Sequence, residues 1–121
     1  MYYVSYRLSQ RGWNVMPTAR NARGIDLVIY ETTGRNFLGI QVKALSKRSA
    51  VPLGNSLKKV MGDYWVIAIK VRSEPICFVL TPDEVVQYSK RTERNGRVSY
   101  WLEATSYDLD DFREAWNKIR I

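Results

Sequence analysis

The chain of 121 residues is 45% hydrophobic and 26% charged, which is the balance expected of one soluble globular domain over residues 1–121. It has no histidine and one cysteine, so histidine-based catalysis, intrachain disulfides and zinc sites are excluded. Any catalysis must use carboxylates, amides, lysine or tyrosine, and a bound metal would be oxygen-liganded Mg²⁺ or Mn²⁺.

The positive charge is concentrated in the first half of the chain, and the formal net charge is +7. Residues 1–60 contain ten lysines and arginines against two acids, whereas residues 61–121 contain nine against ten. Charge that only kept the protein soluble would be spread evenly, so the asymmetry predicts a phosphate-facing surface in the first half. No apolar run is long enough to span a bilayer and no signal-peptide pattern occurs, so we expect a cytoplasmic protein with no membrane partner.

The first half of the chain predicts one helix and three strands. Apolar residues four positions apart indicate a helix over residues 2–11, and a short strand is expected at 13–16. The apolar runs 25–30 and 37–44 predict two strands, and Gly34 in the loop between them suits a hairpin turn. These two strands should therefore pair in antiparallel fashion.

The second half predicts further strands and helices. We expect a short helix around 56–61, strands at 64–71, 76–80 and 98–102, a helix at 81–89 and a last helix from Asp108. Thr81 and Pro82 suit the N-cap and first position of a helix. The last helix would bury the apolar stripe Phe112, Ala115, Trp116 and Ile119. This order of elements predicts an α/β fold with a central mixed sheet flanked by helices.

Two polar side chains interrupt the apolar strand at 37–44. Alternation along a strand places Gln41 and Lys43 on one face, away from the apolar residues between and around them. An unpaired buried lysine is costly, so Lys43 should face a carboxylate, a cleft or a ligand. A hairpin centred near Gly34 would bring Asp26 beside residues 41–43. The sequence thus predicts a cluster of one carboxylate, one amide and one ammonium group.

This cluster resembles the signature of the PD-(D/E)XK nuclease superfamily, in which an acid on one strand precedes acid-x-Lys on the next. Gly24-Ile-Asp26 and Gln41-Val42-Lys43 match that pattern, as in small Holliday-junction-resolvase-like and intron-encoded members. The resemblance implies a restriction-endonuclease-like αβββαβ core, DNA as partner and a homo-oligomer, a dimer or higher. It also implies that Asp26, Gln41 and the Val42 carbonyl bind Mg²⁺ or Mn²⁺, while Lys43 positions or activates the attacking water.

Two positions depart from the family pattern. Gln41 stands where most members have an acid, which keeps an oxygen ligand but removes a negative charge, so weaker metal binding is expected. Many members also carry a glutamate on the first helix, and Met1 occupies that place here. An alternative role for Asp26 and Lys43 is a buried ion pair that only fixes the strand register.

Six basic residues flank the predicted site and are candidates for phosphate contacts: Arg20, Arg23, Lys47, Arg48, Lys58 and Lys59. Their alternative interpretation is a solvated charged surface.

Our first functional hypothesis is a metal-dependent DNA endonuclease, and the second is a non-catalytic DNA-binding subunit that keeps the nuclease fold. An RNA-binding domain is disfavoured because no RNP-like, KH or glycine-rich pattern occurs. The choice among a junction, a specific site and a damaged duplex depends on loops with no readable code.

Overall fold

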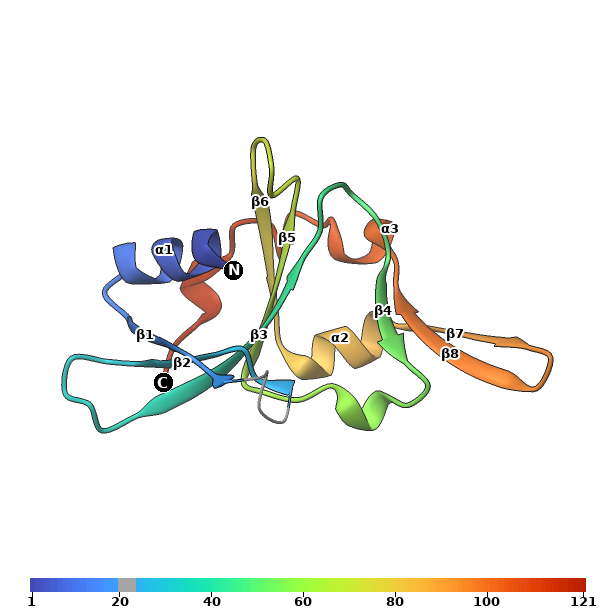
Figure 1. Cartoon of the computed structure of the whole chain (residues 1–121), viewed down its shortest axis with the longest axis horizontal. Helices are drawn as coiled ribbons and strands as arrows, with labels where there is room; N and C mark the ends of the chain where they lie inside the picture. Colours follow the sequence, from blue (N-terminus) through green and yellow to red (C-terminus); the bar gives the residue numbers. More distant parts are fainter. Residues whose placement is uncertain (20–23) are drawn as a thin grey trace.

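The computed structural model describes residues 1–19 and 24–121, whose strands form two sheets (Figure 1). The larger sheet has the strand order β1-β2-β3-β5-β6 and the smaller one has the order β4-β8-β7. The strands are β1 (Asn14–Pro17), β2 (Leu27–Tyr30), β3 (Phe37–Ala44), β4 (Val51–Gly54), β5 (Tyr64–Ile69), β6 (Ile76–Leu80), β7 (Lys90–Arg94) and β8 (Arg97–Leu102). The helical segments include α1 (Tyr2–Gln10), α2 (Pro82–Tyr88), α3 (Ala104–Tyr107) and the 3₁₀ turns η2 (Leu57–Lys59) and η3 (Trp116–Lys118). Among the described residues, no helix combines the length and apolar character that crossing a membrane requires.

The larger sheet is mixed, which confirms the predicted fold class. β1, β2 and β3 pair in antiparallel fashion, β5 and β6 do the same, and β3 pairs with β5 in parallel. A parallel pair needs a crossover connection, and residues 45–63, which include β4 and η2, provide it. The crossover therefore carries the chain away from β3, into the smaller sheet, and back to β5.

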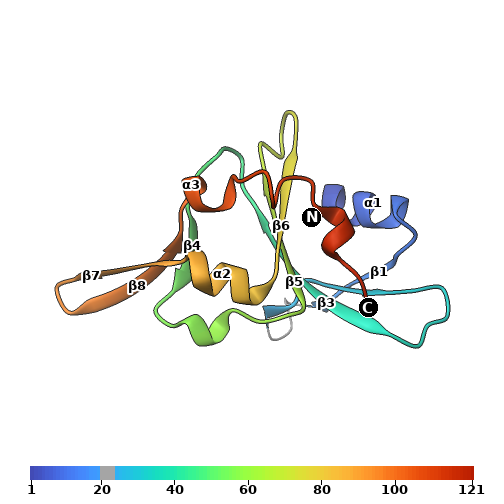
Figure 2. The same ribbon diagram turned by 180° about the vertical axis from the view of Figure 1, so that it is seen from behind.

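The two faces of the larger sheet pack against different elements. On one face, Ile40 of β3 joins a buried cluster with Val4 and Leu8 of α1. On the other face, Ile67 of β5 joins a second cluster with Leu53 of β4. Figures 1 and 2 show α1 on one side of the sheet and the smaller sheet with α2 on the other. The central strands are therefore covered on both sides.

The start of α2 is the capping box that the sequence predicts. Thr81 Oγ1 accepts a hydrogen bond from the Glu84 N–H at 3.2 Å, and Glu84 Oε1 accepts one from the Thr81 N–H at 2.8 Å. Pro82 lies at the first helical position, where its missing N–H costs nothing. Lys118 also donates to Glu84 Oε1 at 2.6 Å, which ties α2 to the C-terminal segment.

The predicted last helix beginning at Asp108 is wrong. α3 ends at Tyr107, and from Asp108 on the chain forms a segment that lies along β6 and then the turn η3. The Val79 N–H donates to the Phe112 carbonyl at 2.9 Å, and the Glu114 N–H donates to the Cys77 carbonyl at 2.8 Å. The backbone groups of this segment therefore bond to the open edge of β6, whereas in a helix they would bond to one another. Three apolar residues of the segment are nevertheless buried: Phe112, Trp116 and Ile119.

Two strands, and with them the smaller sheet, were not predicted. β4 alternates between buried and exposed residues, but it is only four residues long and its exposed positions are Pro52 and Gly54, two residue types that are depleted in strands. β7 is exposed along its whole length, so it has no apolar face to indicate a strand. The helix expected around 56–61 is only the turn η2, and the strand expected at 13–16 lies one residue later.

Candidate active site

Asp26 is anchored to β3 by two hydrogen bonds. Its N–H donates to the Ile40 carbonyl at 2.9 Å, and its carboxylate Oδ2 accepts from the Val42 N–H at 2.7 Å. The Thr18 N–H donates to the Asp26 carbonyl at 2.8 Å, which holds the residue from the other side. Asp26 is 9% exposed. The structure therefore brings Asp26 to the backbone on both sides of Gln41, as the predicted hairpin requires.

Gln41 and Lys43 face a cleft of about 430 Å³. Alternation along β3 sends these two side chains to the cleft and sends Ile40 and Val42 into the cluster beside α1. The cleft is lined by Gly24, Gln41, Lys43, Pro52, Leu53, Lys59, Val60, Met61 and Trp65. Its walls therefore come from both sheets and from the η2 region. Asp26 is not one of these lining residues, and its Oδ2 is turned to the Val42 N–H.

The side-chain oxygen of Gln41 is buried without a hydrogen-bond partner among the described residues. Gln41 is 5% exposed, and a buried polar group left without a partner costs roughly 1–3 kcal/mol. Gly24 stands close by, and a Cβ built there would lie 3.6 Å from Gln41 Oε1. An unpartnered oxygen at a cleft wall is suited to accept a hydrogen bond or to coordinate a cation.

Lys43 extends over an aromatic ring rather than toward Asp26. Its Nζ lies 5.5 Å from the centroid of the Trp65 ring, within the range of a cation–π interaction. No ion pair joins Lys43 to Asp26 in the part of the chain that the structure describes. The alternative role of a register-fixing ion pair is therefore absent. The Trp65 Nε1–H donates to the Met61 carbonyl at 2.8 Å, which holds the ring under the ammonium group.

Trp65 is a site residue that the sequence analysis missed. It belongs to the apolar run of β5, where a tryptophan is expected to serve the core. The signal that could have identified it is the strand register, because β3 and β5 pair in parallel with Gln41 opposite Trp65. Side chains that lie opposite one another on neighbouring strands share a face of the sheet.

Three of the predicted phosphate-contact residues are lysines with described positions. Lys59 lines the cleft, and Lys58 is exposed beside it on η2. Lys47 is exposed after the end of β3 and is not part of the cleft lining. The structure therefore brings one of the three lysines into the same cleft as Lys43.

Two further predicted positions, Arg48 and Met1, add little charge to the cleft. Arg48 Nε lies 2.8 Å from Asp108 Oδ2, so its guanidinium group already has an acidic partner. Arg20 and Arg23 lie outside the described residues. Met1 is the N-cap of α1 and is exposed, and its side chain carries no carboxylate.

The candidate metal donors of Asp26, Gln41 and Val42 are all oxygens. The N–H and C=O groups of one strand residue project to the same edge, so the Val42 carbonyl lies on the edge where its N–H meets Asp26. Within residues 1–19 and 24–121, no three histidine, cysteine or acidic side chains could hold a metal together. One carboxylate, one amide oxygen and one carbonyl fit a cation such as Mg²⁺, which keeps several waters and needs only one or two carboxylates.

No protein-family model matches the chain, and no curated protein matches it. Similar solved structures include Hjc, a Holliday junction resolvase from Archaeoglobus fulgidus, with a TM-score of 0.54 and 18% identity over 88% of this chain and 90% of the other. They also include the bacterial homing endonuclease I-Ssp6803I, with a TM-score of 0.62 and 18% identity over 97% of this chain and 85% of the other.

The chain therefore has the restriction-endonuclease-like fold of the PD-(D/E)XK nucleases, as the sequence resemblance implied. Because the sequence identity to each neighbour is only 18%, the structural similarity establishes the fold and nothing more. The fold by itself assigns no role to the residues of the cleft, because one fold can carry different activities.

Proposed function

We propose that this chain is an endonuclease that hydrolyses phosphodiester bonds in DNA with the help of Mg²⁺ or Mn²⁺. The observation that carries the proposal is the wall of the cleft formed by β3, where Lys43 and Gln41 with its unpartnered oxygen face the cleft, and Asp26 is hydrogen-bonded to the Val42 N–H between them. This wall belongs to a fold shared with a Holliday junction resolvase and a homing endonuclease. A polyanionic substrate also suits the net charge of +7.

The residues that would hold the metal are Asp26, Gln41 and Val42, the last through its carbonyl. When bound, the ion would supply positive charge at the scissile phosphate and lower the pKa of water in its shell. Asp26 Oδ2 accepts from the Val42 N–H, so Oδ1 is the carboxylate oxygen left for the cation. The same hydrogen bond orients the carboxylate before any ligand arrives.

Lys43 acts on the attacking water and on the phosphate. Its ammonium group has three donors, and the Trp65 ring on one side leaves donors turned toward the cleft. One donor orients the water, and the charge offsets negative charge that develops on the phosphate oxygens. Lys59 lines the same cleft and binds an adjacent phosphate.

A DNA-binding subunit without cleavage is the second candidate. It is favoured by the single carboxylate at the site, since the described residues include no group of three metal-binding acids. Gln41 and Met1 stand at two places where family members often have acids. Both candidates bind DNA, so cleavage separates them.

The test is a cleavage assay on supercoiled, linear, branched and single-stranded DNA, with and without Mg²⁺ or Mn²⁺. The wild type should cut at least one of these DNAs only with metal, and Lys43→Gln or Asp26→Asn should lower the rate about 100-fold or more while leaving the protein folded. Lys70→Gln removes an exposed lysine outside the cleft and should keep the wild-type rate. DNA binding without cleavage would establish the second candidate, and full activity in folded Lys43→Gln would overturn the assignment.

A further inference from the structure

The β7–β8 hairpin is an arm that extends from the body of the molecule. β7 is the outer strand of the smaller sheet, and all five of its residues are exposed. Figures 1 and 2 show the β7–β8 turn at the opposite end of the molecule from the β2–β3 turn. Because β7 buries no side chain, packing in the core does not account for its sequence.

Two arginines occupy paired positions at the end of this arm. Arg94 and Arg97 are cross-strand partners on either side of the Asn-Gly turn, and like charges in that arrangement destabilise a hairpin. The arm's other two cations are neutralised in the ion pairs Lys90–Glu103 and Arg91–Glu93, both at 3.2 Å. Within the described chain, Arg94 and Arg97 form no ion pair. The arm therefore keeps two uncompensated charges at its end despite their mutual repulsion.

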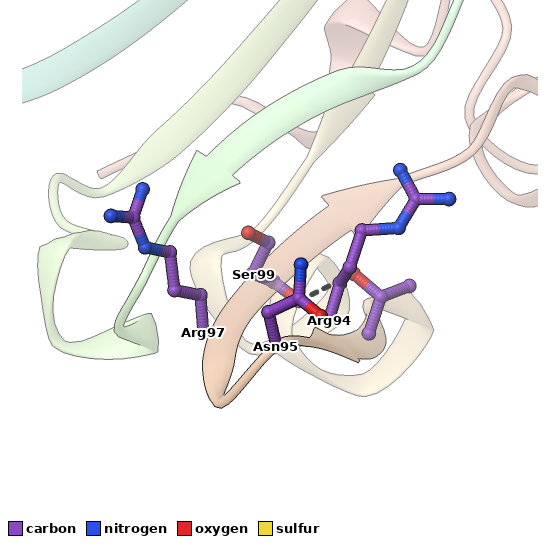
Figure 3. A pocket seen from close by; sticks show the side chains of 5 residues that line it. Arg94, Asn95, Arg97 and Ser99 are labelled. Carbon is purple, nitrogen blue, oxygen red and sulfur yellow. Dashed lines mark hydrogen bonds between the residues drawn. The ribbon is translucent and has the colours of Figure 1, made fainter.

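The side chains around this turn are hydrogen-bond donors (Figure 3). They border a hollow of about 490 Å³ that is lined by Thr92, Arg94, Asn95, Arg97 and Ser99. In Figure 3 the guanidinium groups of Arg94 and Arg97 extend on either side of Asn95. The planar donor fork of a guanidinium group matches the oxygens of a phosphate, and charge-assisted bonds of this kind are stronger than neutral ones. The chemistry of the hollow thus suits a phosphodiester.

The arm is continuous with one wall of the candidate active site. Pro52 and Leu53 of β4 line the cleft, β4 pairs with β8, and β8 pairs with β7. A single hydrogen-bonded sheet therefore connects the cleft to the arm. A DNA duplex that places one phosphate in the cleft can follow this sheet and present other phosphates to the arm.

We propose that the end of the arm, formed by Arg94, Asn95 and Arg97, is a second DNA contact that binds the sugar-phosphate backbone away from the cleavage point. This inference rests on the proposed function for its ligand and adds an anchor to it. Contacts to phosphates position a duplex without reading its sequence. An acidic protein or a second copy of the chain would offer carboxylates instead, but the continuity with the cleft favours DNA.

The first experiment measures DNA affinity at several salt concentrations in EDTA, so that cleavage does not interfere. In Arg94→Gln/Arg97→Gln, the slope of log affinity against log salt should become shallower by about one to two units, because each phosphate contact contributes about 0.9. Lys70→Gln/Arg72→Gln removes the same charge near the β5–β6 turn and should keep the wild-type slope. An unchanged slope in the arm variant would overturn the inference while leaving the proposed function standing. A wild type that binds no DNA would overturn both.

Cross-linking provides a second measurement that does not depend on the arginine variants. A photoactivated cross-linker on Thr92→Cys can be attached selectively, because burial raises the pKa of the natural Cys77 thiol to about 12. The labelled arm should cross-link to DNA, whereas the same label on Arg72→Cys should not. Cross-links to a second copy of the chain, without DNA products, would overturn the inference and assign the arm to self-association.

Discussion

The metal affinity expected of the cleft depends most directly on Gln41, whose side-chain amide is neutral. Its Oε1 is buried without a partner among the described residues, so a ligand that satisfies it removes an existing cost. An amide oxygen can coordinate Mg²⁺ but brings no negative charge to offset the cation. Lys43 adds positive charge on the same face of β3. Metal binding to the free chain should therefore be weak and should strengthen when phosphate oxygens enter the cleft.

Gln41→Glu should bind Mg²⁺ or Mn²⁺ more tightly than the wild type, by roughly tenfold or about 1.4 kcal/mol. The reason is that the site would then have two carboxylates instead of one. Without metal, the buried charge should lower the melting temperature, and adding Mg²⁺ should raise it more than in the wild type. Calorimetric titration without DNA and thermal melting in EDTA or Mg²⁺ are the measurements. The cleavage rate is a separate matter, because the new carboxylate can also pair with Lys43.

Gln87→Glu is the matched control for this variant, since Gln87 is exposed on α2. Its metal affinity should equal that of the wild type. Equal or weaker metal binding in Gln41→Glu would show that residue 41 is not a ligand, and the DNA-binding subunit without cleavage would gain support.

At the scale of elements, local sequence patterns correctly predicted the elements that are stabilised by contacts between residues close in sequence. The β2–β3 hairpin and the Thr81 capping box depend on residues close in sequence, and both are present. The C-terminal segment has helical spacing of its apolar residues, but its backbone bonds to β6, which lies more than 30 residues earlier in the sequence. Glu114 also adopts a φ of 50°, which interrupts a helix. The edge of β6 competes with helix formation in the C-terminal segment, and no pattern within that segment indicates this competition. The extended conformation of the segment could therefore not be predicted.

The contact between α2 and the C-terminal segment should make stability depend on pH. Burial opposes ionisation of Glu84, but the Lys118 ammonium group and the Thr81 backbone N–H outweigh it and hold the pKa of the carboxyl below its ordinary value of 4.5. A pKa lowered by folding contributes stability above the ordinary value, and that contribution is lost as pH falls through the folded pKa. The stabilisation should therefore be complete at neutral pH and disappear in acid.

Lys118→Met should lower the free energy of unfolding by about 0.5–1 kcal/mol at pH 7, the upper part of the range for partly exposed ion pairs. The difference from the wild type should shrink as pH falls below about 4.5, because Glu84 is then protonated in both proteins. Urea unfolding at a series of pH values measures both effects. Lys90→Met breaks the more exposed pair with Glu103 and should change stability less. A Lys118→Met difference that stays constant from pH 7 to acid would contradict this account of Glu84.

At the scale of the whole molecule, the topology determined which candidate site residues could be predicted. Asp26, Gln41 and Lys43 lie on one hairpin, so a local pattern predicted that they come together. Trp65 reaches Lys43 through the parallel β3–β5 pairing, which forms only after a long crossover. The arginines of the arm were missed for another reason: acids elsewhere in residues 61–121 balance the charge of that half. The net charge of a long segment conceals a small cluster within it.

The cleft and the arm should bind one duplex together. Wild-type affinity should fall steeply with salt, because binding to several phosphates releases their counterions. Lys58→Gln/Lys59→Gln and Arg94→Gln/Arg97→Gln should each make the salt slope shallower by about one to two units. If the two clusters bind different phosphates, the slope changes should add in the fourfold variant, as expected for sites without shared partners. Cleavage at saturating DNA should slow in the lysine variant, since Lys59 lines the cleft, and stay near wild type in the arm variant. If the salt slope of the variant with all four substitutions equals that of either double variant, both clusters compete for the same phosphates. A nearly flat plot of log affinity against log salt for the wild type would contradict phosphate-based binding altogether.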